Sequence, residues 1–497
     1  MNNNLEENIN KIKNHLEEGS SLIVKKFFIG TDEYIEAALI FINGLVDKNA
    51  INRDILQPLM IEARENLKGK EDLESYICKK YICVGDNILE NDINKTVDSI
   101  KFGNAVLILE DCLKYIIIES SGGNYRAISE PENESTVRGP REAFIENMEI
   151  NLSIIKRRIK DKNLVIEKFV IGKISQSEVA MVYIKGIVNE KTLKSVRDKI
   201  KNINKNIDVI IGVGQLGQYI ENHTYSVFPQ YYITERADVV EANIVEGKIG
   251  LFVEGSPQVA TVPALFIEFF QTSEDYYQRF IVASFIRFLR IISIFVVISF
   301  SSIYLNFAKF NIEALSIKLA LPIIRSRSEI ALNPFFEILI MEVFIEVLRE
   351  GGIRLPSKVA QTLSVIGGII IGEMSVRAKI VSPDTLLVVG ASVIASFLIP
   401  NYEMTLTIRL LKFPLLVISN FMGALGIVLF WFVMIVHLLS LDSFGVPYIS
   451  LNQSDLKDIF IRAPLWKMDK RPEDIGPEDK VRQRNFKYRR FKFGNKE

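Results

Sequence analysis

The sequence has 497 residues, and its 60 basic residues balance its 60 acidic residues, so no overall field favours nucleic acid. Mean hydropathy is +0.19, although 24% of the residues are charged. The average conceals two halves: the chain is mixed and polar up to about Tyr277, and long apolar runs dominate from Phe280 to Leu441. The sequence therefore predicts an α/β N-terminal region of two subdomains, an α-helical polytopic membrane domain and a basic cytoplasmic tail.

The first 20 residues are polar and lack the basic flank and apolar core of a signal peptide, so we expect the first domain to stay inside the cell. Three cysteines predict free thiols, and with three histidines they are too few for a zinc site. The chain has no Walker A loop, no HExxH and no GxSxG motif. We therefore expect no enzyme activity, no catalytic residues, no metal and no cofactor.

After the polar segment at residues 1–20, residues 21–128 predict a first α/β subdomain. Helical patterns, such as residues 31–47, alternate there with β-branched runs at residues 104–110 and 113–120. Residues 163–277 predict a second α/β subdomain with a helix at residues 189–204. Its expected strands lie at residues 165–172, 178–188, 207–213, 247–255 and 257–265.

Gly212, Gly214 and Gly217 match the GxGxxG pattern of dinucleotide-binding folds. A dinucleotide site also needs a βαβ crossover and an acidic residue that closes the next strand. The residues that follow, 221–236, instead predict an irregular loop. We therefore reject a dinucleotide site and expect these glycines at a strand end.

Residues 129–162 are charged throughout and hold few residues that could be buried. One interpretation is a solvated linker followed by a surface helix. The alternative is contact with a neighbouring subunit, for which Glu130, Arg138, Arg141, Glu142 and Arg157 are the candidate residues.

The transmembrane domain is expected at residues 278–450 with about four to six helices. Arg279, Arg287 and Arg290 flank the apolar run at residues 291–308 on its N-terminal side, which predicts that the soluble domains are cytoplasmic. The last run, residues 413–441, exceeds the roughly 20 residues that a bilayer requires. It must tilt, kink near Gly423 and Gly426, or project beyond the membrane.

A stretch at residues 333–358 carries Glu337, Glu342 and Glu346 among aliphatic and aromatic residues. A carboxylate in hydrocarbon needs a partner, water or a proton, so these residues are candidates for an ion pathway or gating. At roughly 100° per residue Glu342 and Glu346 share one stripe and Glu337 lies about 140° from Glu342, so no single neighbour can cover all three. An amphipathic helix at the membrane interface is the alternative.

Pro334 and the glycine pair at residues 351–352 mark the expected start and end of this helix. The next run, residues 359–378, contains Gln361, Ser364 and Gly368, which suit close helix packing or a pore wall. Near its end Glu373 could pair with Arg377, one turn later.

The tail, residues 451–497, ends in a basic and aromatic cluster that predicts the cytoplasmic side and contact with anionic lipid headgroups. Binding of nucleic acid is the less favoured alternative. A further apolar run lies at residues 385–400 and brings the candidate spans to five. If both termini lie inside, the number of spans is even, so one of these five is not a simple crossing. The glutamate helix is the candidate that we suspect.

Short segments rich in charged and turn-forming residues follow one another along the chain in a specific order. They are Glu130-Pro131, Glu134, Val137-Arg138-Gly139-Pro140-Arg141-Glu142, Phe144, Glu146, Asn151, Arg157, Thr234-Glu235-Arg236, Asp238, Glu246-Gly247, Gly255-Ser256-Pro257, Glu274-Asp275-Tyr276-Tyr277, Asn333-Pro334-Phe335-Phe336-Glu337, Met341-Glu342, Leu348-Arg349-Glu350, Gly352-Ile353-Arg354-Leu355-Pro356, Gly367-Gly368, Ser382-Pro383, Ser443-Phe444-Gly445-Val446-Pro447-Tyr448 and Arg462-Ala463-Pro464. In this order and spacing they resemble the A subunits of bacterial spore germination receptors of the GerA type. One departure is Ala237, where the pattern would have proline.

The resemblance implies an integral membrane subunit of the spore inner membrane. Its implied partners are a transporter-like B subunit that senses nutrients, a lipoprotein C subunit, membrane lipid and further copies of itself, with a pentamer as the expected ring. It also implies release of ions, monovalent cations among them, when germinants bind, and no binding of nucleic acid.

Two functional hypotheses follow. In the first, identical subunits form a ring whose third helix, with Gln361, Ser364 and Gly368, lines a pore, while Glu337 or Glu342 sets cation preference. In the second, the chain is a non-conducting scaffold or signal-transducing subunit for its nutrient-binding partner.

Overall fold

The computed structural model describes residues 3–15, 22–30, 34–67, 70, 72–85, 87–101, 103–110, 112, 114–120, 131, 134, 136, 138–204, 206–356, 359, 367–449, 462–465, 468 and 470–483. The chain divides into two compact units. The first unit comprises Met1–Glu221, Tyr231–Pro263 and Asp469–Phe486, and the second comprises Asn222–Gln230, Ala264–Met468 and Lys487–Glu497.

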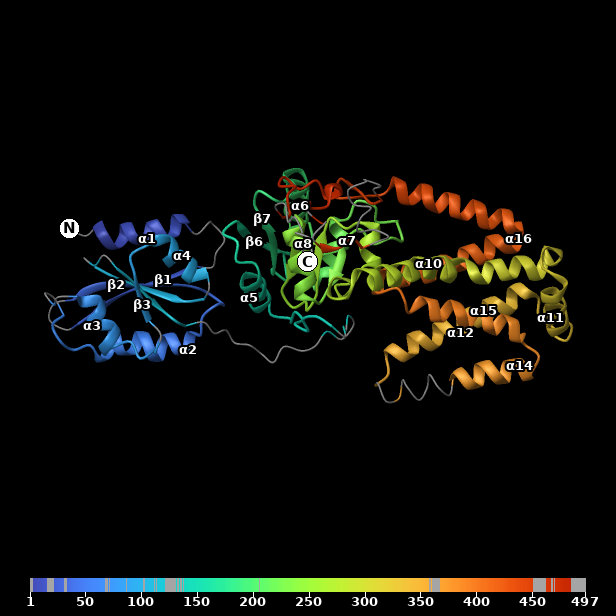
Figure 1. The fold of residues 1–497 in the computed structure, drawn as a ribbon, viewed down its shortest axis with the longest axis horizontal. Coiled ribbons are helices and arrows are strands. Elements are labelled where there is room, and N and C mark those ends of the chain that lie inside the picture. Colours follow the sequence, from blue (N-terminus) through green and yellow to red (C-terminus); the bar gives the residue numbers. More distant parts are fainter. Residues whose placement is uncertain are drawn as a thin grey trace, which may run out of the picture. The chain divides into compact units, whose positions relative to one another are not determined.

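The first sheet of the first unit is antiparallel, with strand order β1-β2-β4-β5-β3. Its inner strand β2, which lies between β1 and β4, sends Ala37, Leu39 and Phe41 to one core and the alternate residues to a second core on the other face. Figure 1 shows helices on both faces of this sheet. Its strands are β1 (Leu22–Ile29), β2 (Ile35–Ile42), β3 (Asn87–Glu90), β4 (Ala105–Leu109) and β5 (Tyr115–Ile118).

Helices α1 and α4 pack on the side of Ala38, Ile40 and Ile42, and η1, η2 and α3 pack on the opposite side. The sequence-based prediction of a helix within residues 31–47 is wrong, because β2 fills its middle. Both faces of β2 are buried, so its apolar run lacks the polar alternation that marks a half-exposed strand. The helices are α1 (Asn3–His15), α2 (Lys48–Ala50), η1 (Ile51–Leu56), η2 (Pro58–Glu62), α3 (Leu73–Lys80) and α4 (Ile93–Lys101).

The second sheet has the order β6-β7-β9-β10-β8, which repeats the strand order of the first sheet, and it is also antiparallel. Helices α5 and α8 share a core with Ala180, Val182 and Phe252 on one face. Its elements are α5 (Met148–Arg158), β6 (Leu164–Ile171), β7 (Ser177–Ile184), α6 (Glu190–Asn204), α7 (Val213–Ile220), β8 (Tyr232–Thr234), α8 (Ala237–Val245), β9 (Ile249–Val253) and β10 (Val259–Val262).

The expected strand at residues 207–213 is wrong, because these residues form a loop that leads into α7, with Gly212 as the N-cap. The glycines therefore begin a helix after a loop and do not close a strand. Gly217 lies against the ring of Tyr231, which a Cβ at this position would approach to 2.3 Å. Close packing of α7 accounts for this glycine, and the strand–turn–helix arrangement of a dinucleotide site is not what these residues form.

In the described part of residues 129–162 the expected helix is present as α5, but the chain from Ala143 onward is not solvated throughout. Phe144, Met148, Leu152 and Ile155 are buried in the second subdomain, packed with α8 and the sheet. Ala143 also forms a β-bridge with Arg236. The apolar residues were few but spaced along one face of α5, which is enough for a short helix to be buried.

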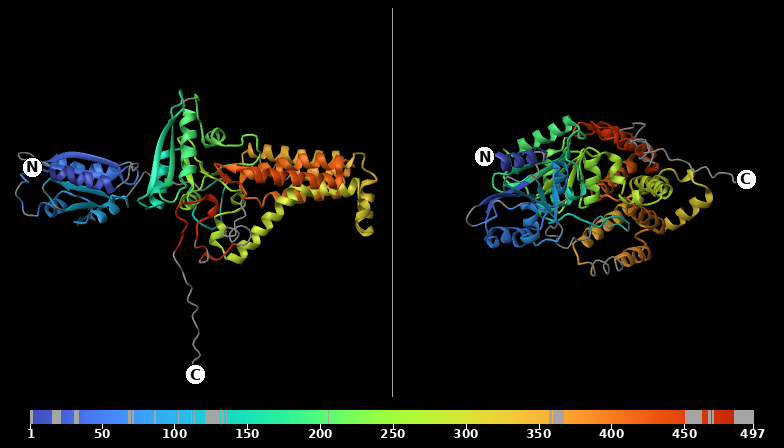
Figure 2. Two further views of the ribbon diagram at one scale, coloured as in Figure 1. Left: turned by 90° about the horizontal axis from the view of Figure 1, so that it is seen from above. Right: turned by 60° about the vertical axis from the view of Figure 1, so that its left-hand side comes forward.

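The helical part of the second unit is built around α10, which packs against α15 and α16 (Figure 2). Trp431 of α16 donates from Nε1 to Ser299 Oγ of α10 at 2.8 Å. The helices are η3 (Phe266–Phe270), α9 (Glu274–Tyr277), α10 (Phe280–Lys309), η4 (Ile312–Ala314), α11 (Ile317–Arg327), α12 (Pro334–Ile353), η5 (Ile370–Met374), α14 (Ser375–Arg377), α15 (Pro383–Ser396) and α16 (Tyr402–Ser440).

In the described part of the chain, two helices are long and apolar enough to cross a membrane, namely α10 with 30 residues and α16 with 39 residues. The shorter α15 has 14 residues, about 21 Å at 1.5 Å per residue. Of the three alternatives for the long last helix, the structure has the kink, because Gly423 in α16 has the non-helical angles φ 60° and ψ −138°. The number of membrane spans and their orientation stay predictions.

After α16, β11 (Asp442–Ser443) and β12 (Val446–Pro447) form a small hairpin. The described residues 470–483, which include η7 (Glu473–Ile475), belong to the first unit. There Arg471 donates to the carbonyl of Val245 at 3.0 Å and to the Asp479 carboxylate at 2.7 Å. Most of the predicted basic cluster of the tail lies outside the described residues.

Candidate functional site

Helix α12 holds the three predicted glutamates, and its start follows from local sequence. The Asn333 side chain caps the helix by accepting from the Phe335 amide at 3.2 Å, and Pro334 occupies the first turn. The helix continues through the glycine pair and ends at Ile353. The predicted boundaries are therefore confirmed within a few residues.

Glu342 and Glu346 share one face of α12, as their spacing predicted, and meet two cations of α16. Glu342 is 1% exposed; it accepts from Ser301 Oγ of α10 at 2.7 Å and from Lys412 Nζ at 2.6 Å. Lys412 also donates to Glu346 at 2.9 Å. Arg409 forms a further ion pair with Glu346. This glutamate–lysine cluster joins α10, α12 and α16.

Glu337 faces different neighbours, as its position on the helix predicted. It is fully buried and accepts from Arg327 Nη1 of α11 at 2.8 Å. Its other oxygen accepts from the Ser382 amide at 2.6 Å. Ser382 is the N-cap of α15, so this carboxylate lies at a helix N-terminus, where negative charge is stabilised.

Each of the three carboxylates thus faces a cation inside the same chain. A buried carboxylate is tolerated only when it is paired and its remaining lone pairs accept hydrogen bonds, and both conditions hold for Glu337 and Glu342. Chemically, such a cluster can lock the helices together. It can also release a charged group when the helices move.

Of the predicted pore residues, Gly368 is described and exposed, whereas Gln361 and Ser364 lie outside the described residues. Gly368 borders an open hollow of about 500 Å³ that Gly372, Pro383 and Leu386 also line. The predicted pair of Glu373 and Arg377 is confirmed on the same helical stretch at 2.5 Å. The pore role of these residues is a proposal below.

Of the predicted subunit contacts, Glu130 lies outside the described residues, and Arg138 and Arg141 are exposed. Glu142 pairs within the chain with Arg157 and with Arg158, the latter at 2.9 Å. These ion pairs hold the C-terminal end of α5 to the preceding segment. A role in contacts between subunits stays a prediction.

The segment before Glu142 is held by a second buried cluster. Arg236 donates to Thr136 Oγ1 at 2.7 Å and to the carbonyl of Pro140 at 3.1 Å, and it pairs with Asp238 at 2.8 Å. Glu134 bonds to Thr234. Burial raises the pKa of Glu134 to about 7, with the neighbouring Glu235 charge acting in the same direction and the Thr234 bond opposing it.

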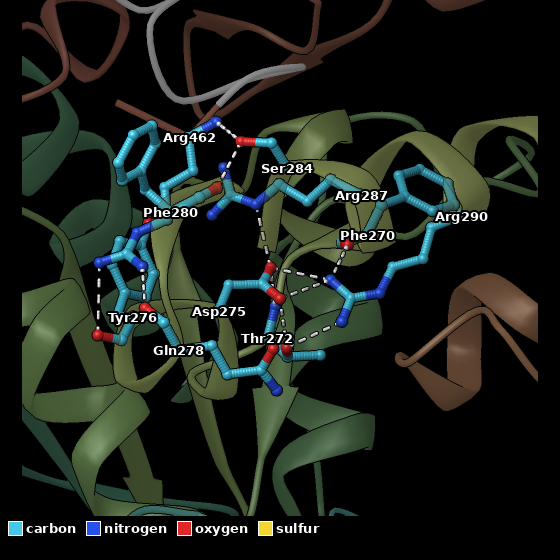
Figure 3. Close-up of polar contacts among 10 residues, drawn as sticks. All are labelled: Phe270, Thr272, Asp275, Tyr276, Gln278, Phe280, Ser284, Arg287, Arg290 and Arg462. Atoms are coloured by element: carbon cyan, nitrogen blue, oxygen red, sulfur yellow. Dashed lines mark hydrogen bonds and ion pairs between the residues drawn. The ribbon is translucent and has the colours of Figure 1, made fainter. Parts of the chain in front are cut away.

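Sequence reasoning missed a buried arginine cluster at the start of α10 (Figure 3). Asp275 accepts from Arg287 Nε at 3.0 Å and from Arg290 Nη1 at 2.8 Å. Arg290 also donates to the carbonyl of Phe270 at 3.2 Å and to Thr272 Oγ1 at 3.1 Å. Burial opposes ionisation of Asp275, but the hydrogen bonds and charges of the two arginines outweigh it and hold the pKa of that carboxyl below its usual range.

The same cluster binds a residue from the tail. Arg462 donates to the carbonyls of Gln278 at 2.8 Å and Tyr276 at 3.3 Å, and its amide donates to Ser284 Oγ at 3.1 Å. The Tyr276 ring lies 5.2 Å from the Arg462 guanidinium and 5.6 Å from that of Arg287. A usable sequence signal existed, because arginines inside an apolar helix require a partner and Asp275 is the nearest preceding acid.

A loop at residues 222–230 forms part of the second unit and contacts the end of α16. His223 Nε2 lies 2.7 Å from Asp442 Oδ1, and Ser226 Oγ lies 3.1 Å from His437 Nε2. Two of the three histidines in the chain therefore lie at this junction. The sequence indicated a loop here but gave no signal for its contacts, which join residues more than 200 positions apart.

Comparison with known proteins identifies the family of this chain. The model of the family described as Bacillus/Clostridium GerA spore germination protein matches residues 10–474. This chain belongs to the GerA family. The resemblance inferred from the sequence is thereby confirmed over nearly the whole chain.

Among relatives of this GerA family chain, spore germination protein KA of Bacillus subtilis (strain 168) is 37% identical over 96% of this chain and 88% of its own length. Spore germination protein A1 of the same organism is 34% identical over 92% of this chain and 95% of its own length. The protein named uncharacterized membrane protein YfkQ, also from Bacillus subtilis (strain 168), is 34% identical over 94% of this chain and 91% of its own length.

A solved structure, the crystal structure of the N-terminal domain of the A subunit of the Bacillus megaterium spore germinant receptor GerK3, is 31% identical. The match covers 54% of this GerA family chain and 97% of the chain in the GerK3 crystal structure, with a TM-score of 0.42.

Proposed function

We propose that this chain is the A subunit of a spore germinant receptor, a membrane subunit that oligomerises and forms the ion-conducting channel opened when nutrients are sensed. Membership of the GerA family supports the role in germination. The lengths and apolar composition of α10 and α16 support insertion in a membrane. The proposed location is the inner membrane of the spore, with the two α/β subdomains on the cytoplasmic side.

The observation that carries the gating part of this proposal is the glutamate–lysine cluster. Glu342 and Glu346 tie α12 to α16 through Lys412, and Glu342 also bonds to α10. Both long apolar helices are thereby linked to one charged helix. We propose that opening the channel rearranges these pairs, and that Glu337 takes part through its pair with Arg327.

In this proposal Gln361, Ser364 and Gly368 line the pore in a ring of identical subunits, a pentamer by expectation, through which monovalent cations pass. The exposed Arg138 and Arg141, with Glu130, Glu142 and Arg157, contribute to contacts between neighbours. A transporter-like B subunit binds the nutrient, and a lipoprotein C subunit completes the receptor.

Germination of spores that carry Glu342→Gln tests this proposal. Loss of the carboxylate charge weakens the hold on Lys412, so we expect ion release on nutrient addition to change while the protein still accumulates in the membrane. Glu350→Gln is the matched control, because Glu350 lies on the same helix in an exposed pair with Arg354, and it should leave ion release unchanged.

Unchanged germination and ion release in the Glu342→Gln spores would contradict the gating role. A non-conducting scaffold is the second candidate function. It is favoured by the internal pairing of all three α12 carboxylates, which suits a packed bundle as well as a gate. A scaffold predicts no ion flux through the purified, assembled chain.

A further inference from the structure

Helix α11 is a short helix that follows α10, and it has two distinct faces. Its inner face contacts the bundle: Ile323 packs in the core shared by α10, α12 and α15, Ser326 bonds to Asp384, and Arg327 pairs with Glu337 at 2.8 Å. Figure 2 shows this helix lying across the end of α10. The contacts of the inner face therefore fix which side of α11 points outward.

The outward face is apolar. Ile317, Leu321 and Ile324 are 76%, 45% and 50% exposed. Their spacing of four and three residues places them on one stripe of the helix, within about 60°. Leu319 is also exposed but lies on another side. An apolar stripe turned away from the protein core needs a covering that is itself apolar.

The charges beside this stripe are basic. Lys318 and Arg325 are exposed and lie about 100° and 80° from Ile317 on the helical wheel, so both flank the same edge of the stripe. Within this fully described helix no residue is acidic. A second copy of the chain would have to supply acidic groups here, whereas anionic lipid headgroups supply negative charge next to acyl chains.

The position of α11 agrees with a lipid covering. It is separated from α10 by only a few residues, and Phe310, the C-cap of α10, is a large apolar side chain that is 41% exposed. The outward stripe of α11 therefore lies next to an exposed apolar side chain at the end of a helix long enough to cross a bilayer. A helix that lies across the end of a membrane span, as α11 does in Figure 2, has the position of an interfacial helix.

We propose that α11 lies on the membrane surface, with Ile317, Leu321 and Ile324 in the boundary between headgroups and acyl chains and with Lys318 and Arg325 contacting anionic headgroups. This inference rests on the proposed function only in requiring that α10 spans the membrane. Through Arg327 and Ser326 the helix also links the lipid surface to Glu337 of α12 and Asp384 of α15.

Spin labels test the placement. The full chain, with its three cysteines replaced by serine, is reconstituted in vesicles that contain phosphatidylglycerol, and one cysteine is introduced and labelled at Ile317, Leu321 or Ile324. We expect collisions with oxygen, which concentrates in lipid, to exceed those with a water-soluble nickel complex at all three positions. Labels at Phe295 on α10 and at the exposed Ile174 of the first unit are the lipid and water references.

The two reference labels distinguish an error in the membrane span of α10 from an error in the placement of α11. A label at Phe295 that collides mainly with nickel would contradict the membrane span itself. If Phe295 behaves as lipid-exposed but the α11 labels collide mainly with nickel, α11 lies in water and the inference is wrong. Low collision rates with both probes would show that protein covers the stripe, which also overturns it.

Charge is tested separately with the double variant Lys318→Gln/Arg325→Gln. We expect it to reduce the ratio of oxygen to nickel collisions at Ile324 in vesicles with phosphatidylglycerol and to have no effect in vesicles of phosphatidylcholine alone. An equal effect in both kinds of vesicle would contradict contact with anionic headgroups.

Discussion

Replacing Lys412 should show most clearly how much the buried ion pairs stabilise the helix bundle. It is buried and shared by Glu342 and Glu346, and Glu342 would retain Ser301 as its hydrogen-bond donor. Removing one partner of a buried ion pair costs about 3–5 kcal/mol because the other charge stays in a poor environment. We therefore expect Lys412→Met to lower the thermal unfolding midpoint of the full chain in detergent strongly.

The control for Lys412→Met is Arg354→Met, which breaks an exposed pair on α12 and should cost less than about 1 kcal/mol. The double variant Lys412→Met/Glu342→Met should recover most of the loss, because it replaces both charges by apolar groups. An unfolding midpoint that is the same for Lys412→Met and Arg354→Met would contradict the buried pairing.

At the scale of single residues, the sequence identified the carboxylates of α12 but not their partners. The angle of about 140° between Glu337 and Glu342 predicted two different neighbours, and the structure has two. The sequence could not identify Lys412 or Arg327 as these partners, because the periodicity of α12 describes one helix and its partners lie on other helices. Two of the three arginines used for the orientation argument, Arg287 and Arg290, are buried against Asp275 rather than placed on the surface.

At the scale of elements, Gly423 determines the shape of α16. Its φ of 60° with ψ of −138° lies outside the regions that residues with a side chain readily adopt. A Cβ there would also lie 3.0 Å from Asn306 Oδ1 and 3.3 Å from the Phe310 ring. We expect Gly423→Ala to destabilise the chain by about 1–3 kcal/mol, measured by thermal unfolding.

Gly390→Ala is the matched control for Gly423→Ala. Gly390 lies within helix α15, and nothing lies within 4 Å of a Cβ built there. Alanine should therefore be neutral or stabilise the helix by up to about 1 kcal/mol. Equal effects of the two substitutions would show that the kink is not set by this glycine.

The elements also show where sequence patterns succeed and fail. Excess length predicted a tilt, a kink or a projection of α16, of which the structure has the kink. Strand-like runs of β-branched and apolar residues predicted β6 and β7. The pattern failed for β2, which is buried on both faces, and for α5, whose few apolar residues proved sufficient. In both cases burial depends on neighbouring elements that a local pattern does not contain.

At the scale of the whole molecule, the chain combines two sheets of the same strand order with a helical unit. The two sheets were predicted only as α/β subdomains, because strand order depends on pairing between segments that are far apart in sequence. The helical unit couples both long apolar helices to charged residues of α12. We propose that this helical unit conducts ions.

The measurement that tests this claim most directly is cation flux through liposomes that contain the purified chain alone. We predict flux of monovalent cations that Glu342→Gln alters and Glu350→Gln leaves unchanged, because Glu342 alone of the two lies in the glutamate–lysine cluster. Absence of flux from a demonstrably assembled oligomer, both alone and after reconstitution with the B and C subunits proposed as its partners, would contradict the channel and leave the scaffold.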